Sequence, residues 1–285
     1  MPMKRTVGII GAGTMGSGIA QVAALSGFDV LLYDLSGDTL KASMERIKGD
    51  LRKSMQKGNA TPSAATAALT RIRPRRTFNE MGAADLVIEA APEDLEVKKE
   101  IFRALDQIVA PRAVLATNTS SLSITSIGSL TTTPESVVGM HFFNPPTRMK
   151  LVEIVRGSQT SEQTVRTAHE MALAMGKTPV FSSDTPGFIV NRVARPFYGE
   201  ALRVLGEGTA TAEEIDRIVR LSGGFRMGPF ELMDLIGIDV NYAVTKSIYE
   251  QFFHEPRFRP HPIQRRMVES GMLGRKTGQG FYRYE

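Results

Sequence analysis

The sequence predicts an α/β protein in which a doubly wound sheet is followed by an all-α C-terminal domain. Residues 6–181 alternate short apolar strands with amphipathic helices, the order typical of a sheet with helices on both faces. A glycine-rich turn joins the first strand to the first helix. After Asp184 only helical periodicity remains. We therefore expect one domain over residues 1–184 and a second over residues 185–285.

The composition is that of an ordinary globular protein and excludes several kinds of chemistry. The 285 residues are 42% hydrophobic and 23% charged. The absence of cysteine excludes disulfides and thiolate chemistry, and four histidines are too few for a convincing metal cluster, so no metal is expected. No apolar run approaches the roughly 18 residues that a membrane helix needs, and the N-terminus lacks the long apolar region of a signal peptide. We expect a cytoplasmic protein that makes no membrane contact.

The segment from Thr6 to Asp34 carries the clearest motif. A strand over residues 6–10 leads directly into Gly11-Ala12-Gly13-Thr14-Met15-Gly16. A helix over residues 17–26 follows, and a second strand over residues 29–33 ends at Asp34. This is the order of a Rossmann-type dinucleotide-binding unit.

Each residue of this motif has an expected role. Gly11 permits the tight turn, Gly13 lets the backbone approach a pyrophosphate, and Gly16 allows close helix–strand packing. The helix N-terminus, at Thr14 and Met15, offers N–H donors to the phosphates. Asp34 lies where a carboxylate binds the ribose hydroxyls, and it would repel a 2′-phosphate. The motif therefore favours NAD over NADP.

The other expected elements continue the same alternation. Glu93, Ser120 and His141 lie at or just beyond strand ends, where ligands bind in doubly wound sheets. In the second domain, Thr211 and Glu214 form a capping box for a helix that Gly223 closes. We expect strands over residues 71–78, 85–91, 113–117 and 178–181, and helices over residues 40–57, 62–69, 93–108, 122–127, 161–175, 188–205, 211–221, 230–236, 240–253 and 263–269.

Two apolar runs between Val137 and Val155 flank a loop over residues 144–150. If the runs pair as an antiparallel ribbon about Thr147, His141 and Glu153 become direct partners, with Cβ atoms roughly 4.5–5.5 Å apart. A carboxylate this close stabilises an imidazolium and orients the ring, as a general acid/base requires. A hydrogen-bonded pair that satisfies two buried polar groups is the alternative.

Positive charge is concentrated between Lys41 and Arg76. This window holds ten basic and two acidic residues, a net charge of +8, although the whole chain carries +5. A local positive field indicates an anionic partner, either a nucleic acid or a multiply phosphorylated small molecule. The window has no interleaved aromatic residues and no recognition motif, which argues against a nucleic acid.

Taken together, the motifs of the chain resemble the 3-hydroxyacyl-CoA dehydrogenases, and the length and spacing are most similar to the short bacterial 3-hydroxybutyryl-CoA dehydrogenases. The resemblance covers essentially the whole chain. The segments that carry it are residues 11–16, 118–122, 139–145, 150–153, 184–192, 227–230 and 274–278.

The resemblance implies a role for each matching residue. His141 would be the general acid/base and Glu153 its orienting carboxylate, with Ser120 and Asn191 completing the catalytic and substrate site. The implied NAD contacts are Glu93, Lys98, Ser120, Asn144 and Lys276, in addition to the residues of the glycine turn. Lys53 and Lys57, in the basic window, would bind the CoA moiety. Asp50, seven positions before Lys57, departs from the small hydroxyl residue that relatives often carry there.

The sequence thus predicts an NAD-dependent oxidoreductase that interconverts a short-chain 3-hydroxyacyl-CoA and its 3-oxoacyl-CoA in fatty acid metabolism. The resemblance also implies a homodimer formed through the helical domain. Two alternatives remain open: a dehydrogenase of a free 3-hydroxy acid, and a non-catalytic dinucleotide-binding protein.

Overall fold

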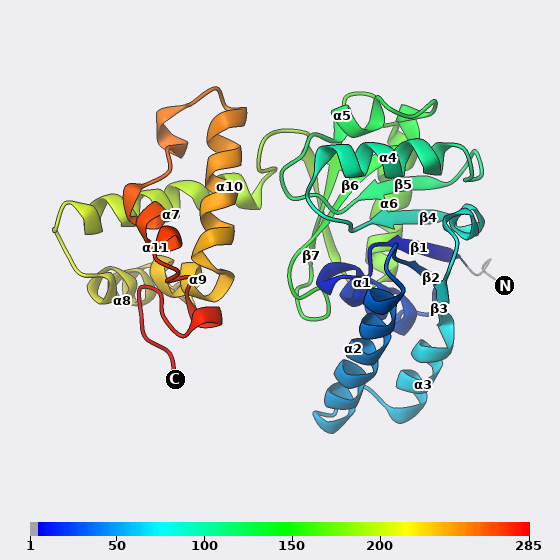
Figure 1. The fold of residues 1–285 in the computed structure, drawn as a ribbon, viewed down its shortest axis with the longest axis horizontal. Coiled ribbons are helices and arrows are strands. Elements are labelled where there is room, and N and C mark those ends of the chain that lie inside the picture. The colour runs from blue at the N-terminus through cyan, green and yellow to red at the C-terminus, as the bar shows by residue number, and fades with distance from the viewer. Residues whose placement is uncertain (1–4) are drawn as a thin grey trace. The chain divides into compact units, whose positions relative to one another are not determined.

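The computed structural model describes residues 5–285 and forms two compact units, Met1–Thr185 and Pro186–Glu285. We call them the N-terminal unit and the helical unit (Figure 1). No helix within residues 5–285 is both long and apolar enough to cross a membrane.

The N-terminal unit is built on one eight-stranded sheet with the order β3-β2-β1-β4-β5-β6-β7-β8. All neighbouring strands are parallel except β6 and β7, which are antiparallel. The predicted doubly wound sheet is therefore confirmed. The strands are β1 (Thr6–Ile10), β2 (Asp29–Tyr33), β3 (Ile72–Arg75), β4 (Leu86–Glu89), β5 (Val114–Thr117), β6 (Val137–Phe142), β7 (Leu151–Arg156) and β8 (Thr178–Ser183).

Helices connect these strands and make up the second unit. Those of the N-terminal unit are α1 (Thr14–Leu25), α2 (Gly37–Gln56), α3 (Pro62–Arg71), α4 (Leu95–Asp106), α5 (Ile124–Gly128) and α6 (Glu162–Ala174). Those of the helical unit are α7 (Val190–Gly206), α8 (Ala212–Gly223), α9 (Pro229–Ile236), α10 (Ile238–Gln251) and α11 (Pro262–Glu269).

The ends of α8 show how local sequence sets a helix. The Thr211 side chain accepts a hydrogen bond from the Glu214 N–H, and the Glu214 carboxylate accepts one from the Thr211 N–H, which confirms the predicted capping box. The predicted closing residue was wrong by one position. Gly223 is still helical, and Gly224 adopts the left-handed conformation (φ 67°) that ends the helix.

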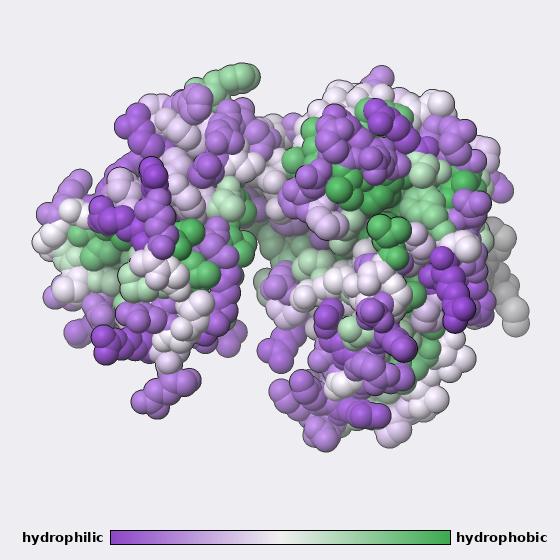
Figure 2. All heavy atoms as spheres, viewed as in Figure 1, coloured by the Kyte–Doolittle hydropathy of each residue, from purple (hydrophilic) through white to green (hydrophobic). Residues whose placement is uncertain are grey.

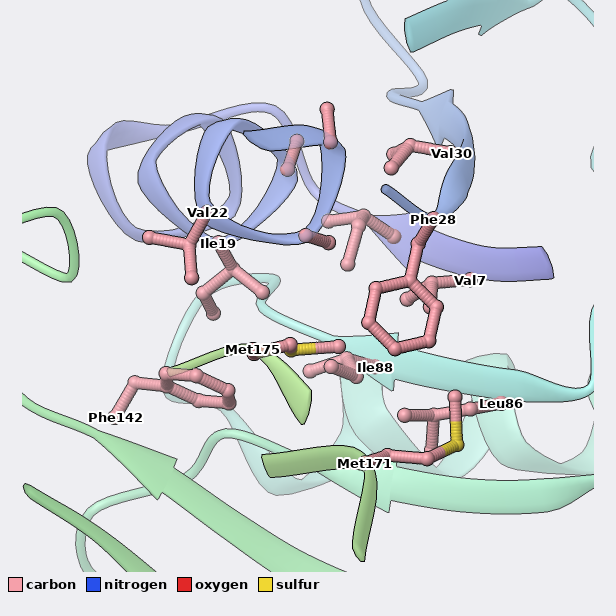
Figure 3. Packing of buried hydrophobic residues seen from close by; sticks show 14 of the residues in the cluster. Val7, Ile19, Val22, Phe28, Val30, Leu86, Ile88, Phe142, Met171 and Met175 are labelled. Atoms are coloured by element: carbon pink, nitrogen blue, oxygen red, sulfur yellow. The ribbon is translucent and has the colours of Figure 1, made fainter. Parts of the chain in front are cut away.

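The main core lies between one face of the sheet and the helices α1 and α6. Figure 3 shows Ile19 of α1 on the side of the sheet that carries Ile88 of β4, and Met171 of α6 beside Leu86 of β4. The opposite face of β6 packs on α5, because a Cβ added to Gly139 would lie 2.9 Å from the Cδ1 atom of Ile124. Helices therefore cover both faces.

The loop between β6 and β7 is held against α1 and β8. Pro146 packs on Gly18 of α1 so closely that an added Cβ would lie 2.9 Å from the proline Cδ. Lys177, which is 8% exposed, donates hydrogen bonds to the carbonyls of Pro146 and Met149. Burial lowers the pKa of this lysine. The loop that joins the two strands is thus anchored at several points.

The helix α2 carries much of the positive charge noted in the sequence. Its surface is largely hydrophilic in Figure 2, and Figure 1 shows it beside α1 and α3. Lys53 is exposed in its last turn, and the exposed Lys57 is its C-cap residue.

Candidate active site

The glycine turn after β1 leaves room for a ligand at one position. Gly11 has φ 94°, and a Cβ there would lie 2.6 Å from the Ala90 carbonyl oxygen. A Cβ on Gly16 would lie 1.8 Å from the Gly11 carbonyl oxygen. A Cβ on Gly13 would meet nothing within 4 Å. Packing within the unit therefore requires glycine at residues 11 and 16, whereas Gly13 keeps the approach to the turn open.

The start of α1 and the end of β2 complete a cradle for a dinucleotide. Gly13 is the N-cap of α1, and no described side chain caps this end. The backbone N–H groups of the first turn, at Thr14 and Met15, are therefore suited to phosphate oxygens. Asp34 accepts hydrogen bonds from the N–H groups of Ala12 (2.7 Å) and Ser36 (2.9 Å), which hold its carboxylate beside the turn. The residues present fit NAD.

His141 and Glu153 are direct partners across the antiparallel strands β6 and β7, so the predicted pairing is confirmed. The Nδ1 atom of His141 lies 2.7 Å from the Oε2 atom of Glu153, and the two residues are 6% and 0% exposed. An ionised carboxylate only accepts hydrogen bonds, so in the tautomer that fits such a partner Nδ1 is the donor. The second ring nitrogen, Nε2, points away from Glu153. The Phe143 ring packs on the imidazole, with centroids 4.5 Å apart.

Strand alternation gathers more polar groups on the same face of the sheet. Val138, Met140 and Phe142 of β6 belong to the main core, so His141 points to the opposite face. Glu89 and Thr117 end β4 and β5, are paired in register, and also point to that face. The carboxyl ends of three neighbouring parallel strands therefore carry Glu89, Thr117 and His141.

A buried ion pair joins two of these strands to α4. Lys98 is 1% exposed, and its ammonium lies 2.7 and 2.9 Å from the two carboxylate oxygens of Glu89. The Thr117 hydroxyl donates a hydrogen bond of 2.6 Å to the same carboxylate, as does the Ala91 N–H at 2.7 Å. The sequence analysis missed Glu89. The available signal was a carboxylate at the end of a wholly apolar strand, nine residues before a lysine on an amphipathic helix.

Glu93 organises the loop after β5. Its Oε1 atom accepts hydrogen bonds from the Thr119 hydroxyl (2.6 Å), from the N–H and hydroxyl of Ser120 (2.9 and 3.3 Å), and from the N–H and hydroxyl of Ser121 (both 3.1 Å). The Lys98 ammonium lies 3.4 Å from Oε2. Burial of Glu93 opposes its ionisation, but the Lys98 charge and these hydrogen bonds outweigh it and lower the pKa. Glu93 is therefore a carboxylate at neutral pH.

Ser120 lies in this loop and does not cap a helix. The N-cap of α5 is Ser123, whose side chain accepts a hydrogen bond from the Ser126 N–H. Asn118, which the sequence analysis did not assign a role, accepts a hydrogen bond from the Phe142 N–H at 2.9 Å and so fixes the strand next to His141. Asn144 is exposed at the start of the loop after β6.

The structure places two predicted site residues in the helical unit. Asn191 lies in the first turn of α7 and is partly buried. Lys276 lies in a short 3₁₀ helix, Arg275–Thr277, with its ammonium 2.6 Å from the Asp239 carboxylate. Within residues 5–285 there is no group of three or more His, Asp or Glu side chains placed to hold a metal ion.

Models of one protein family match both units of the chain. Residues 6–185 match the NAD-binding domain of the 3-hydroxyacyl-CoA dehydrogenases, and residues 187–284 match the C-terminal domain of the same family. The chain is 49% identical over 278 residues to a 3-hydroxyadipyl-CoA dehydrogenase of Escherichia coli K12, covering 98% of the chain and 58% of that relative's length. It is 43% identical to a probable 3-hydroxybutyryl-CoA dehydrogenase of Bacillus subtilis 168, covering 97% and 96% of the two chains.

A solved structure shows the same fold. The (S)-3-hydroxybutyryl-CoA dehydrogenase of Ralstonia eutropha superposes with a TM-score of 0.95 at 41% identity, covering 99% of each chain. The predicted class of enzyme, an NAD-dependent oxidoreductase acting on the CH–OH group, and NAD as cofactor are confirmed by these matches. The chain therefore belongs to the 3-hydroxyacyl-CoA dehydrogenase family.

Proposed function

We propose that the chain catalyses the NAD-dependent interconversion of a 3-hydroxyacyl-CoA and a 3-oxoacyl-CoA. The observation that carries this proposal is the buried His141–Glu153 pair, 2.7 Å apart, in the sheet whose first strand leads into the glycine turn. A histidine oriented by a carboxylate suits proton transfer at a hydroxyl group. The dinucleotide cradle after β1 suits a hydride acceptor.

In this mechanism His141 moves the proton and Glu153 orients the ring. When bound, the nicotinamide ring of NAD supplies the hydride acceptor. His141 uses Nε2 to take the proton from the substrate 3-hydroxyl as C3 is oxidised, and the imidazolium returns it in the reverse direction. Glu153 holds the Nδ1–H and stabilises the positive charge that develops on the ring.

The other predicted site residues have binding roles in the proposal. Ser120, fixed by Glu93, and Asn191 contact the oxygen at C3 of the substrate. Glu93, Lys98, Asn144 and Lys276 support the nicotinamide half of NAD. Lys98 is held within the unit by Glu89, so its contribution comes through its charge and through Glu93.

The CoA moiety is assigned to α2. Coenzyme A is polyanionic, and Lys53 and Lys57 are exposed near the end of a helix that lies in the basic window. The B. subtilis and R. eutropha relatives are named for 3-hydroxybutyryl-CoA, and 3-hydroxybutyryl-CoA with acetoacetyl-CoA is the substrate pair we propose first. The 3-hydroxyadipyl-CoA named for the E. coli relative has a longer chain that ends in a carboxylate, and one buried residue of the helical unit, considered below, favours it as a second candidate.

The test is NADH oxidation with acetoacetyl-CoA and with free acetoacetate. We expect turnover of the thioester and little turnover of the free acid. His141→Gln should lower kcat by about 10²- to 10⁴-fold, with a smaller effect on NADH binding. Glu153→Gln should cost less than His141→Gln, because Glu153 orients the ring and transfers no proton.

The two alternatives give different results in the same assay. Faster turnover of free acetoacetate identifies a dehydrogenase of free 3-hydroxy acids. NADH binding without turnover of free acetoacetate, acetoacetyl-CoA or 3-oxoadipyl-CoA identifies a non-catalytic dinucleotide-binding protein. Near-wild-type turnover by His141→Gln ends the acid/base assignment and leaves His141 as a structural partner of Glu153.

We also propose that the chain forms a homodimer through the helical unit. Ile218 and Leu221 of α8 and the nearby Phe225 are exposed, at 61%, 75% and 54%. Their spacing puts them on one side of the helix and its C-terminal extension. An apolar surface of this kind is typical of a protein interface. Location in the cytoplasm remains a prediction of the sequence.

A further inference from the structure

The helical unit buries a cation that has no acidic partner within residues 5–285. Arg195 of α7 is 5% exposed. Its hydrogen-bond partners among the described residues are neutral: the carbonyl oxygens of Asn191 (3.1 Å) and Asn241 (3.0 Å) and the hydroxyl of Thr245 (2.9 Å). A buried charge without a counter-ion is costly, so its presence calls for a reason.

These contacts involve only some of the N–H donors of the Arg195 guanidinium. The three hydrogen bonds come from Nε and Nη1. Nη2 donates no hydrogen bond to any residue in the described part of the chain. The Tyr198 ring lies 5.0 Å from the guanidinium carbon and supports one side of the plane. Burial lowers the pKa of Arg195 to about 10, so the group is still charged at neutral pH. A planar, charged donor held in a fixed position is well suited to a carboxylate.

Arg195 faces a small cavity with a positive wall. The cavity measures about 10 Å³, which is the room of a single water molecule. Arg257, Arg259 and His261 also line it, and no Asp or Glu in the described part of the chain does. Burial and the charges of Arg203 and Arg266 lower the pKa of His261, which reflects the positive field in this region. An anionic group entering the cavity would meet donors and no competing carboxylate.

The position of Arg195 on α7 relates it to the substrate. It follows Asn191 by four residues, so the two lie on the same side of the helix about one turn apart. The proposed function, on which this step rests, places Asn191 beside the oxygen at C3. An acyl chain with three further carbons spans a distance comparable with one helical turn, so its end group reaches the level of Arg195.

We propose that Arg195 is a specificity-determining residue that binds a terminal carboxylate on the acyl chain. The substrates selected are then coenzyme A thioesters of 3-hydroxy dicarboxylic acids, with about six carbons in the acyl group. The ion pair formed on binding supplies the counter-ion that Arg195 lacks in the protein alone.

The test compares two 3-oxoacyl-CoA substrates of equal length, 3-oxoadipyl-CoA and 3-oxohexanoyl-CoA, which differ in having a carboxylate or a methyl group at the end. Acetoacetyl-CoA is the third substrate. We expect the wild type to prefer 3-oxoadipyl-CoA over 3-oxohexanoyl-CoA in kcat/KM. Arg195→Gln should lower that ratio by about 10- to 100-fold, the effect of a hydrogen bond between charged groups.

Arg103→Gln is the control, because it removes an exposed arginine of the N-terminal unit, outside the helical unit that holds the cavity, and should keep the wild-type ratio. Arg195→Lys should retain part of the preference. A wild type that uses both six-carbon substrates equally well overturns the inference, as does an Arg195→Gln variant that loses activity equally on all three. In both cases turnover of acetoacetyl-CoA leaves the proposed function standing. Absence of turnover with every thioester overturns both.

Discussion

Glu89 neutralises Lys98 in the interior of the N-terminal unit, where both side chains are inaccessible to water. Glu89→Gln would leave the buried ammonium with the Glu93 carboxylate 3.4 Å away as its charged partner. Removing one partner of a buried pair typically costs about 3–5 kcal/mol. We expect a loss of this size in the free energy of unfolding, measured by urea denaturation.

A surface ion pair on α4, the helix that carries Lys98, provides the control. Glu96→Gln removes the partner of Lys99, 2.7 Å away, and Glu96 is 76% exposed, so stability should change by less than about 1 kcal/mol. The double variant Glu89→Gln/Lys98→Met should recover part of the loss, because it leaves no buried charge unpaired. Equal losses of unfolding free energy in Glu89→Gln and Glu96→Gln would show that the buried pair contributes no more to stability than the surface pair.

Asp34 makes a prediction about the cofactor. Its carboxylate lies beside the glycine turn and would repel the 2′-phosphate of NADPH. The wild type should therefore have a higher kcat/KM with NADH than with NADPH, and Asp34→Ala should narrow the difference. Because Asp34 also holds the Ala12 N–H, Asp34→Asn is the variant that removes the charge and retains an acceptor. Equal use of both cofactors by the wild type would refute the assignment.

Contacts between residues close in sequence could be predicted, whereas contacts between residues far apart in sequence could not. His141 and Glu153 were predicted as partners because a symmetric loop fixes the register of a ribbon. The contacts of Glu93 with Ser120 and Ser121 join residues 27 and 28 positions apart on separate loops. No local spacing encodes them, and Glu93 was instead predicted to begin a helix that starts at Leu95.

At the scale of elements, α2 is the part of the fold whose charge predicts a ligand. We expect Lys53→Glu/Lys57→Glu to raise KM for acetoacetyl-CoA and to leave KM for NADH nearly unchanged. The effect should shrink as salt is added, because exposed charges are screened. Steady-state kinetics at low and high ionic strength provide the measurement.

A variant with the same change in net charge tests whether position matters. Arg103 and Arg112 are exposed in the same unit, outside α2. Arg103→Glu/Arg112→Glu should leave KM for the CoA substrate close to that of the wild type. If KM rises equally in the two double variants, or rises equally for NADH, then α2 does not hold the CoA moiety.

Elements with strong periodicity were predicted well, and their ends less well. The strands β1 and β2 have the predicted bounds because a glycine or an acidic residue follows an apolar run directly. Most helix ends shifted by one to three residues, as at α2, where Ser36 caps the helix through the Thr39 N–H before any apolar residue appears. A helix start is set by a capping hydrogen bond, and apolar periodicity does not reveal it.

At the scale of the whole molecule, the exposed apolar surface on α8 predicts the oligomeric state. Light scattering should give a mass twice that of the 31.2 kDa chain. Leu221→Glu places a charge in the centre of that surface and should yield a monomer. Leu35→Glu, at a position that is 94% exposed in the N-terminal unit, should remain a dimer. A monomeric wild type would contradict the proposed interface.

The contact between Gly18 and Pro146 limits how this enzyme can be redesigned. The helix that would receive the pyrophosphate and the loop beside His141 touch at a point with no room for one extra methyl group. If a cofactor-binding segment is grafted from another protein, any side chain at the position of Gly18 would therefore collide with Pro146 in the loop between β6 and β7. Laboratory evolution of cofactor preference should accordingly keep Gly18 fixed, or vary it only together with Pro146. A larger residue at position 18 would push Pro146 and so displace the loop beside His141.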